Sequence, residues 1–375
     1  MITFEFATAG RIFFGAGKLN EAPAIARQFG RRALVVIDKM AQSLQRVEPL
    51  LKELLAAGVE ASTFSVASEP SLEVVGAGAE LAAAEKCDVV ISVGGGSVMD
   101  TGKAIAALVT NGGVALDYVE VVGKGQPLVK PSLPHVAIPT TAGTGAEVTR
   151  NAVLESAEHR VKVSMRSPFL LPTVALVDPE LTYSVPPTVT ASTGLDALTQ
   201  LIEPFMSVKS NPLTDALCRE GMMRVARSLQ NAVEHGNDAA AREDMALASL
   251  FGGLALANAG LGAVHGLAGP MGAMYHVPHG VLCAAFLPHV IEVNVHAASQ
   301  AGDSRVVQRF TEVKRIVGDV GKLCRAVGIK SLRDFGIPRD DFPSIIEKAA
   351  GASSMKGNPV KLTNEQLREI LQRAF

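Results

Sequence analysis

The first half of the chain alternates short, β-branched apolar runs with helical patterns. Apolar runs at 32–39, 60–66 and 88–96 predict strands. Between them, residues 46–58 and 73–86 carry apolar side chains at the three-to-four-residue spacing of amphipathic helices. Strands that alternate with helices in this way predict a parallel sheet with helices on both faces.

The pattern changes after Pro186 and Pro187. Before them, residues 134–149 predict a strand that enters a Gly/Thr loop. Beyond them, the apolar spacing is helical almost to the last residue. We therefore expect a Rossmann-like α/β domain over residues 1–186 and an all-α domain over residues 187–375, with the active site in the cleft between them.

Length and charge narrow the range of partners. The chain has 375 residues, more than one hydrophobic core usually serves, which supports two domains. Charged residues make up 19% of the chain and the net charge is -2, so no nucleic-acid partner is expected. Four scattered cysteines and an N-terminus without a signal-peptide pattern favour the cytoplasm. A homodimer is the default oligomeric expectation.

Residues 245–291 contain no Asp, Glu, Lys or Arg, yet they carry four of the chain's eight histidines. The stretch is long enough to cross a bilayer, but glycines, three prolines and the histidines interrupt it. We interpret it as buried helices of a protein core and expect no membrane partner.

A glycine-rich loop follows one of the predicted strands. Gly94, Gly95 and Gly96 end the strand, and Ser97 and a helical pattern come next. Glycines let the backbone approach a ligand closely, and a helix N-terminus attracts phosphate. The loop is not a Walker A motif, because five residues separate Gly96 from Gly102. A tight turn is the alternative, but it would need only one glycine.

A second loop supplies the hydroxyl groups of Thr140, Thr141 and Thr144 after another strand. Two such loops at strand ends can hold both phosphates of a dinucleotide. Asp38 ends the first strand, where a carboxylate can bind a ribose and repel a 2′-phosphate, which favours NAD over NADP. Asp38 could instead only cap a turn.

A candidate metal site lies in the helical half. Asp196 and Gln200 are four residues apart, so they share one face of a predicted helix. An aspartate near a helix start is more often a capping residue. His265 and His279 strengthen the metal hypothesis, because two histidines beside Gly-rich turns in an uncharged region are hard to explain as core residues alone.

Several long motifs in one order carry a family resemblance. They include "GGGSVMDTGKA", "IPTTAGTGAEVT", "STGLDALTQLIE" and "GLGAVHGLAGPMGAMYHVPHG", and they span essentially the whole chain. The chain resembles the iron-containing (group III) alcohol dehydrogenases. The resemblance implies the dehydroquinate synthase-like fold of two domains and a reversible, NAD(P)-dependent reduction of a small aldehyde or ketone. It also implies a divalent metal, Fe2+ or Zn2+.

The resemblance assigns the metal ligands to Asp196, position 200, His265 and His279. This chain departs from the family at position 200, where Gln200 replaces a histidine, and at Gly269, where the family has a histidine associated with proton transfer. Asp196, His265 and His279 still form a set of two histidines and one carboxylate, which suits Fe2+ and can also serve at zinc. His276 could replace the imidazole lost at position 269, or it could be a surface histidine.

The resemblance also implies roles for other residues. The expected catalytic residues are Asp196, His265 and His279. The expected cofactor-binding residues are Asp38, Gly95, Gly96, Ser97, Asp100, Thr140, Thr141, Thr144 and Lys162. The expected substrate-lining residues are Asn151, Val153, Phe251, Leu254 and Met355. Lys162 could instead be a surface lysine. Arg150 and Lys356, which are next in sequence to Asn151 and Met355, could bind a substrate carboxylate.

Two alternatives stay open, and the sequence disfavours a third. The chain could be a metal-independent oxo-acid reductase of the maleylacetate reductase type, in which His265 or His279 polarises the carbonyl as an imidazolium. It could be a non-catalytic NAD-binding relative. A lyase related to dehydroquinate synthase would need a basic phosphate site, and the uncharged residues 245–291 do not provide one.

Overall fold

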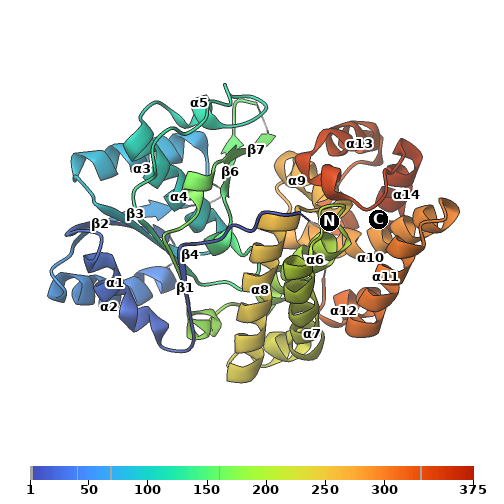
Figure 1. The fold of residues 1–375 in the computed structure, drawn as a ribbon, viewed down its shortest axis with the longest axis horizontal. Coiled ribbons are helices and arrows are strands. Elements are labelled where there is room, and N and C mark those ends of the chain that lie inside the picture. The colour runs from blue at the N-terminus through green and yellow to red at the C-terminus, as the bar shows by residue number, and fades with distance from the viewer. Residues whose placement is uncertain (1–2, 40, 68–69, 160, 330–331) are drawn as a thin grey trace. The chain divides into compact units, whose positions relative to one another are not determined.

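The computed structural model describes residues 3–39, 41–67, 70–159, 161–329 and 332–375. The chain forms two compact units (Figure 1). The α/β unit comprises Thr8–Thr141 and Ala146–Thr182, and the helical unit comprises Met1–Ala7, Ala142–Gly145 and Tyr183–Phe375. Each unit therefore contains segments that are separated along the chain.

The α/β unit is built on a six-stranded sheet in which every pairing is parallel. The strand order is β1-β8-β5-β4-β2-β3. The strands are β1 (Arg11–Phe14), β2 (Arg32–Asp38), β3 (Glu60–Val66), β4 (Val89–Gly94), β5 (His135–Pro139) and β8 (Val174–Val177). The predicted parallel sheet is confirmed.

Helices cover both faces of this sheet. They are α1 (Ala22–Arg27), α2 (Ala41–Ala56), α3 (Leu72–Ala84), α4 (Gly96–Asn111) and the short α5 (Ala115–Tyr118). Along β2, Val35 and Ile37 join a core with α1 and α2, whereas Leu34 and Val36 join a core with α3 and α4. A strand buried on both faces reads as one continuous apolar run, and this explains why the sequence pattern predicts it well.

A small antiparallel hairpin completes the α/β unit. Its strands are β6 (Asn151–Ser156) and β7 (Val161–Arg166), and the sequence patterns do not predict it. Its buried positions, including Ala152, Leu154 and Val163, join the core that contains α3 and α4. Short 3-10 helices link the other elements of this unit at Lys18–Glu21, Ala146–Val148, Pro168–Leu170 and Pro179–Thr182.

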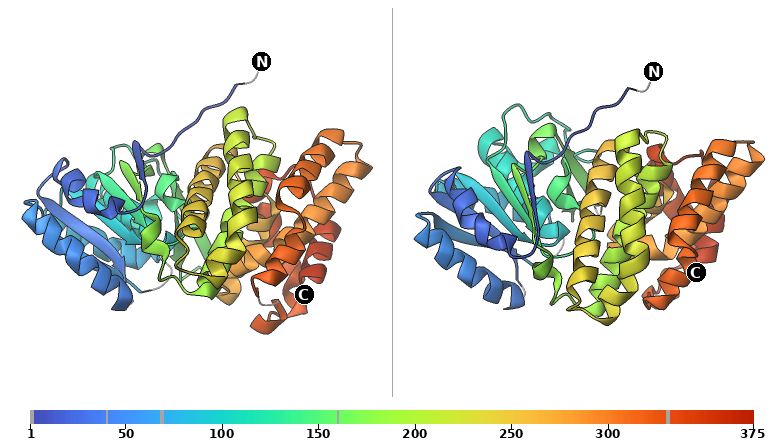
Figure 2. Two further views of the ribbon diagram at one scale, coloured as in Figure 1. Left: turned by 90° about the horizontal axis from the view of Figure 1, so that it is seen from below. Right: turned by 60° about the horizontal axis from the view of Figure 1, so that its bottom comes forward.

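The described residues of the helical unit from Tyr183 onward contain helices and connecting loops, as predicted. The helices are α6 (Pro187–Met206), α7 (Pro212–Glu234), α8 (Ala239–Ala259), α9 (Ala263–Tyr275), α10 (His279–Gln300), α11 (Ser304–Val317), α12 (Val320–Ala326), α13 (Phe342–Gly351) and α14 (Asn364–Ala374). Short 3-10 helices occur at Leu332–Phe335, Arg339–Asp341 and Ser353–Gly357. Figure 2 shows α6, α7 and α8 running side by side.

Local signals explain several helix ends in this unit. Pro187 takes the first position of α6, where the missing N–H costs no hydrogen bond. Asn211 caps α7 by accepting from the N–H groups of Leu213 and Thr214. Gly260 has a φ of 74° at the end of α8, and the chain bends by 101° between α8 and α9. The bend places the start of α9 against α6 rather than in line with α8.

By length and composition alone, α10 could cross a membrane, and so could the bent pair of α8 and α9 if it formed one span. About 50% of the apolar window of α10 is buried inside the structure. Because α10 packs against α6, α9, α11 and α14, we interpret it as the core helix of the helical unit.

Candidate metal centre and dinucleotide loops

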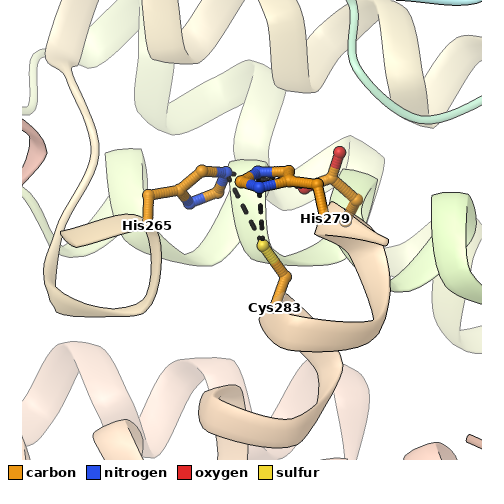
Figure 3. Close-up of side chains that lie close together, drawn as sticks. His265, His279 and Cys283 are labelled. Atoms are coloured by element: carbon orange, nitrogen blue, oxygen red, sulfur yellow. Dashed lines mark hydrogen bonds and ion pairs between the residues drawn. The ribbon is translucent and has the colours of Figure 1, made fainter. Parts of the chain in front are cut away.

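Four side chains with metal-ligating atoms converge in the helical unit. The ligand atoms of Asp196, His265, His279 and Cys283 all lie within 4.8 Å of one another. Asp196 belongs to α6, His265 to α9, and His279 and Cys283 to α10. Figure 3 shows the sulfur of Cys283 pointing toward the rings of His265 and His279. The three residues expected to share a metal site are therefore brought together.

The α6 helix contributes one polar stripe to this cluster. Asp196, Gln200 and Glu203 are spaced by four and three residues, so they lie on the same helix face. All three are buried. A buried carboxylate or amide needs a specific partner, and this stripe is therefore the strongest local sign of a site on α6.

Glu203 orients His265. One carboxylate oxygen accepts from His265 Nδ1 at 2.6 Å, and the other accepts from the backbone N–H of Val264 at 2.6 Å. The second bond satisfies one of the unpaired N–H groups at the start of α9. With Nδ1 donating to Glu203, His265 Nε2 faces Asp196 Oδ1 at 3.5 Å. Sequence reasoning missed Glu203, although its position one helical turn after Gln200 could have indicated it.

His279 is positioned by the tight packing of α10 on α6. It is the first residue of α10, after Pro278. A Cβ at Gly280 would lie 2.2 Å from the carbonyl oxygen of Ser192, so only glycine permits this approach. His279 Nε2 consequently lies 3.7 Å from Asp196 Oδ1.

Cys283 lies one helical turn after His279 on α10. Its Sγ is 3.5 Å from His279 Nε2 and 3.9 Å from His265 Nε2, and the side chain is fully buried. Sequence reasoning missed this residue. The available signal was the same four-residue spacing that links Asp196 and Gln200.

Asp196 has one oxygen committed and one open. Its Oδ2 accepts from Gln200 Nε2 at 3.0 Å, whereas its buried Oδ1 has no hydrogen-bond partner among the described residues. Burial opposes ionisation, but His265, His279 and Cys283 hold the pKa of the Asp196 carboxyl below its usual value. An ionised, buried oxygen that faces two histidines and a thiol fits a divalent cation.

The imidazole of His265 and the thiol of Cys283 respond to the same environment. Burial opposes a charge on His265, yet Cys283, Glu203 and Asp196 together raise its pKa well above the usual value. Burial raises the pKa of the Cys283 thiol to about 12. A cation bound here would displace protons from these ligands.

Gln200 lies beside the cluster, and its role as a metal ligand stays a prediction. Its amide nitrogen faces Asp196, and its Oε1 has no partner among the described residues. A Cβ at Gly269 would meet nothing within 4 Å, so the position of the missing family histidine is open space. His276 is exposed at the C-terminal end of α9 and is not part of the cluster.

Some expected substrate residues lie near the cluster in the same unit. The side chain of Met355 covers α9 at Gly266, next to His265, because a Cβ there would lie 2.7 Å from Met355 Cε. Phe251 is half-buried and Leu254 is buried on α8, which passes close to Gln200 at Gly252. Asn151 and Val153 lie instead on β6 of the α/β unit, and Thr144 belongs to the helical unit.

The expected dinucleotide loops meet at one edge of the parallel sheet. In the register, Ile37 pairs with Val93 and Gly94 with Pro139, so Asp38, Gly95 and Thr140 lie at the carboxyl ends of three neighbouring strands. The N–H of Thr140 donates to the carbonyl of Gly94 at 2.9 Å. Ligands of open α/β sheets bind at this edge.

Gly95 caps α4, and Gly96 and Ser97 form its first turn. The first N–H groups of a helix have no partner within it, so they are available to a phosphate. A Cβ at Gly95 would make only an ordinary contact of 3.5 Å with Thr141 Oγ1, so the fold itself does not require glycine there. The fold therefore leaves space beside Gly95 for the close approach of a ligand.

Asp100 takes part in a buried network that anchors the hairpin. Its Oδ1 accepts from Lys103 Nζ at 3.1 Å, and its Oδ2 accepts from the N–H of Val153 at 3.0 Å. The buried ammonium of Lys103 also donates to Thr149 Oγ1 and to the carbonyl of Asn151, both at 2.8 Å. The carboxylate of Asp100 thus fixes β6 relative to α4.

The hairpin presents one half-buried face that contains three expected residues. Val153 and Asn151 alternate with buried neighbours along β6, and Lys162 of β7 pairs with Glu155. Directly opposed side chains of an antiparallel pair point to the same side. Asn151, Val153 and Lys162 therefore share one face of the hairpin.

Comparison with known proteins gives a consistent result. Residues 9–179 match the iron-containing alcohol dehydrogenase model, and residues 190–375 match the model of the C-terminal part of the Fe-containing alcohol dehydrogenase family. Lactaldehyde reductase of Escherichia coli (strain K12) is 34% identical over 97% of this chain and 97% of its own. A crystal structure of 1,3-propanediol oxidoreductase is 34% identical with a TM-score of 0.91 and covers 100% of both chains. Sulfoacetaldehyde reductase from Bifidobacterium kashiwanohense, solved with NAD+, is 30% identical with a TM-score of 0.88 and covers 99% of this chain and 98% of its own.

A parallel sheet with a phosphate-type loop, joined in one chain to a buried metal-type cluster, fits a nucleotide-dependent oxidoreductase. The chain belongs to the iron-containing alcohol dehydrogenase family. It is an NAD-dependent enzyme that acts on CH–OH groups and their carbonyl counterparts.

Proposed function

We propose that Asp196, His265 and His279 hold a divalent metal, Fe2+ or Zn2+, and that the carbonyl oxygen of a small aldehyde or ketone binds beside them. The reaction is a reduction to the alcohol by NADH, and it is reversible. The observation that carries this proposal is the open Oδ1 of Asp196. It is buried, it has no hydrogen-bond partner among the described residues, and two histidine nitrogens lie 3.5 and 3.7 Å away.

The same observation weighs against a metal-independent enzyme of the maleylacetate reductase type. A carboxylate buried beside the histidines would stabilise their positive charge, which could polarise a carbonyl. However, such an ion pair normally satisfies its oxygens with hydrogen bonds, and Asp196 Oδ1 lacks one among the described residues.

When bound, the metal would supply a Lewis acid for the carbonyl oxygen. The residues of the chain prepare that site. Glu203 keeps Nε2 of His265 directed at Asp196, and Gln200 fixes the Asp196 carboxylate. Met355 covers the helix next to His265 with an apolar side chain, which helps to exclude water. With Gly269 in place of a histidine, the alcohol proton comes from solvent or from another group.

We propose that the diphosphate of NAD(H) binds to the N–H groups of Gly95, Gly96 and Ser97 at the start of α4. Thr140 and Thr141 follow the neighbouring strand and supply hydroxyl groups. Asp38 ends β2 at the same sheet edge, where it would accept hydrogen bonds from the adenosine ribose. Lys162 lies on the hairpin face that also carries Asn151 and Val153.

Replacement of Asp38 tests the cofactor preference. Asp38→Gly removes the charge that repels a 2′-phosphate, so kcat/KM for NADPH should rise relative to NADH by about tenfold or more, which is about 1.4 kcal/mol. The measurement is steady-state kinetics with both cofactors and one carbonyl substrate. Asp88→Gly, before the start of β4, is the control variant. An unchanged ratio for Asp38→Gly would show that another residue selects the cofactor.

Metal removal tests the function as a whole. The purified enzyme is analysed for metal and then assayed for NADH oxidation with short aldehydes, ketones and small oxo-acids, before and after treatment with a chelator. We expect activity to be lost on chelation and restored by Fe2+ or Zn2+. Full activity in metal-free protein would support the metal-independent alternative, and NADH binding without any turnover would support a non-catalytic relative.

The substrate panel also addresses Arg150 and Lys356. Of the five expected lining residues, Val153, Phe251, Leu254 and Met355 are apolar and Asn151 is polar but uncharged, so we propose a small neutral substrate. A strong preference for oxo-acids would instead assign a carboxylate-binding role to Arg150 or Lys356.

We also propose a homodimer that works in the cytoplasm. The four cysteines are all free thiols, which suits a reducing compartment. Size-exclusion chromatography with light scattering would test the oligomeric state.

A further inference from the structure

We propose that the Cys283 thiolate is the fourth protein ligand of the metal, in place of the imidazole that the family has at position 200, and that the resulting site prefers Zn2+ to Fe2+. Gln200 is then a positioning residue for Asp196. This inference rests on the proposed metal-dependent function and adds the identity of the ligand and of the metal.

The distances around Cys283 fit a four-ligand zinc site. Zinc bonds of about 2.0–2.3 Å at tetrahedral angles place ligand atoms about 3.3–3.8 Å apart. Asp196 Oδ1 lies 3.5 and 3.7 Å from the Nε2 atoms of His265 and His279. Cys283 Sγ lies 3.5 and 3.9 Å from the same two nitrogens. All four separations are therefore close to those of a first coordination sphere.

The position of Cys283 on α10 also suits a metal ligand. Cys283 is one turn after His279 on α10, so both side chains leave the same helix face. It is fully buried, and Figure 3 shows its Sγ directed between the two histidine rings. Asp196 Oδ1, which has no hydrogen-bond partner among the described residues, is an independent indication that the cluster receives a cation.

Gln200 is better placed to support Asp196 than to bind the metal. Its Nε2 donates to Oδ2 of Asp196 at 3.0 Å, which leaves Oδ1 to face the histidines. A hydrogen bond of this kind orients a metal-binding carboxylate. The α6 helix thus offers an amide beside Asp196, and α10 offers a thiol within reach of the same point.

The change of ligand alters metal selectivity. Imidazole and carboxylate suit both Fe2+ and Zn2+, whereas a thiolate favours Zn2+ and other softer ions. Four protein ligands match the number in the family, and zinc can expand to five-coordination when a substrate oxygen arrives. The thiolate is therefore compatible with Lewis-acid catalysis.

Cobalt substitution tests the ligand directly. The apoenzyme is titrated with Co2+, and the absorption spectrum is recorded for the wild type, Cys283→Ser and Cys324→Ala. Cys324 is a matched control because it is also buried in the helical unit, where its Sγ contacts the carbonyl of Ala284 at 3.6 Å. We expect an intense thiolate-to-cobalt charge-transfer band in the wild type and in Cys324→Ala, and its loss in Cys283→Ser.

Zinc affinity and X-ray absorption provide two further readouts. We expect Cys283→Ser to bind Zn2+ at least tenfold more weakly and to lose most of the preference for Zn2+ over Fe2+ in competition. X-ray absorption of the zinc-loaded wild type should show one sulfur neighbour at about 2.3 Å, a result that does not depend on the folding of any variant.

The outcomes separate the two proposals. Stoichiometric metal binding without a charge-transfer band or a sulfur neighbour would overturn the role of Cys283 and leave the proposed function intact. Failure of the wild type to bind any of the three metals would overturn both. A band that persists unchanged in Cys283→Ser would assign it to another cysteine and also overturn this inference.

Discussion

Each unit contains a buried cluster of ionisable side chains, and the two clusters differ in how completely they are satisfied. In the α/β unit, Lys103 donates to Asp100, to Thr149 and to the carbonyl of Asn151 at 2.8–3.1 Å. In the helical unit, Asp196 accepts from Gln200 with one oxygen, and the other oxygen has no hydrogen-bond partner among the described residues.

The difference shows how to distinguish buried polar groups that stabilise the fold from those that bind a ligand. The three protons of an ammonium match the three acceptors around Lys103, so this cluster is closed and its role is to hold the hairpin on α4. The cluster around Asp196 leaves an ionised oxygen and two imidazole nitrogens directed at one point. A buried group that a fold leaves unsatisfied is a better guide to a ligand than a buried charge alone.

The largest expected effect is on the stability of the closed cluster. Lys103→Met leaves the carboxylate of Asp100 without its cation, so the free energy of unfolding of the α/β unit should fall by about 3–5 kcal/mol. Denaturant unfolding, followed for each unit, measures the change. The metal content of the folded variant should equal that of the wild type.

Lys124→Met is the matched control for this prediction. Lys124 also forms an ion pair with an aspartate, Asp117, at 2.7 Å, but its side chain is 67% exposed. An exposed pair should contribute no more than about 1 kcal/mol. Equal losses for the two variants would mean that the cluster around Lys103 is not a special anchor.

A smaller effect is expected from the residue that orients the open cluster. Glu203→Gln weakens the 2.6 Å contact with His265 Nδ1, so metal affinity should fall by about 10–100-fold, or about 1.4–2.7 kcal/mol. Competition with a chelator of known affinity measures this loss. Glu292→Gln on α10, which removes an exposed contact with Arg373, should leave the affinity unchanged. A loss of metal affinity in Glu292→Gln would mean that the loss in Glu203→Gln is not specific to the contact with His265.

The smallest effect concerns the pH dependence of stability. It involves a third buried group, His135, which lies in the field of the Lys103 charge. Burial, and then the charge of Lys103, lower the pKa of His135 from 6.5 to about 3. A depressed pKa means that this contribution to stability is present above pH 6.5 and is lost as the pH falls toward 3. The loss is at most about 1.4 kcal/mol per pH unit.

The measurement is denaturant unfolding of the wild type and of His135→Gln between pH 7 and pH 5. The difference between the two profiles isolates His135 from the other histidines, and the variant should lose less stability on acidification. His296→Gln removes an exposed histidine of α10 and should follow the wild type. Parallel profiles for His135→Gln and the wild type would contradict a neutral, buried His135.

The fold could be predicted from the sequence wherever one pattern dominated a segment. β2 and β4 are buried on both faces, and their apolar runs, which only the buried Ser92 of β4 interrupts, show this directly. The hairpin of β6 and β7 escaped prediction because its half-buried, polar face dilutes the apolar signal. Its position also depends on Lys103, which looks like an ordinary helix lysine in the sequence.

The candidate site could be predicted only in part for a related reason. Asp196, His265 and His279 were recognisable from motifs, and the structure brings them together. Glu203 and Cys283 were not, because their partners lie on other helices and the approach of those helices is a tertiary property. Gly280 fixes that approach through contact with the Ser192 carbonyl, and no local pattern reports such a contact.

The discontinuous helical unit has a consequence for how the protein reaches its native state. The N–H of Ala7 donates to the side chain of Asn258, and Gly145 packs so closely on Gly253 that a Cβ would lie 2.4 Å from its Cα. During synthesis, residues 1–7 and 142–145 leave the ribosome well before α8 exists. Both segments must therefore wait for the last half of the chain, and a fragment that begins at residue 187 would lack two segments that belong to its own unit.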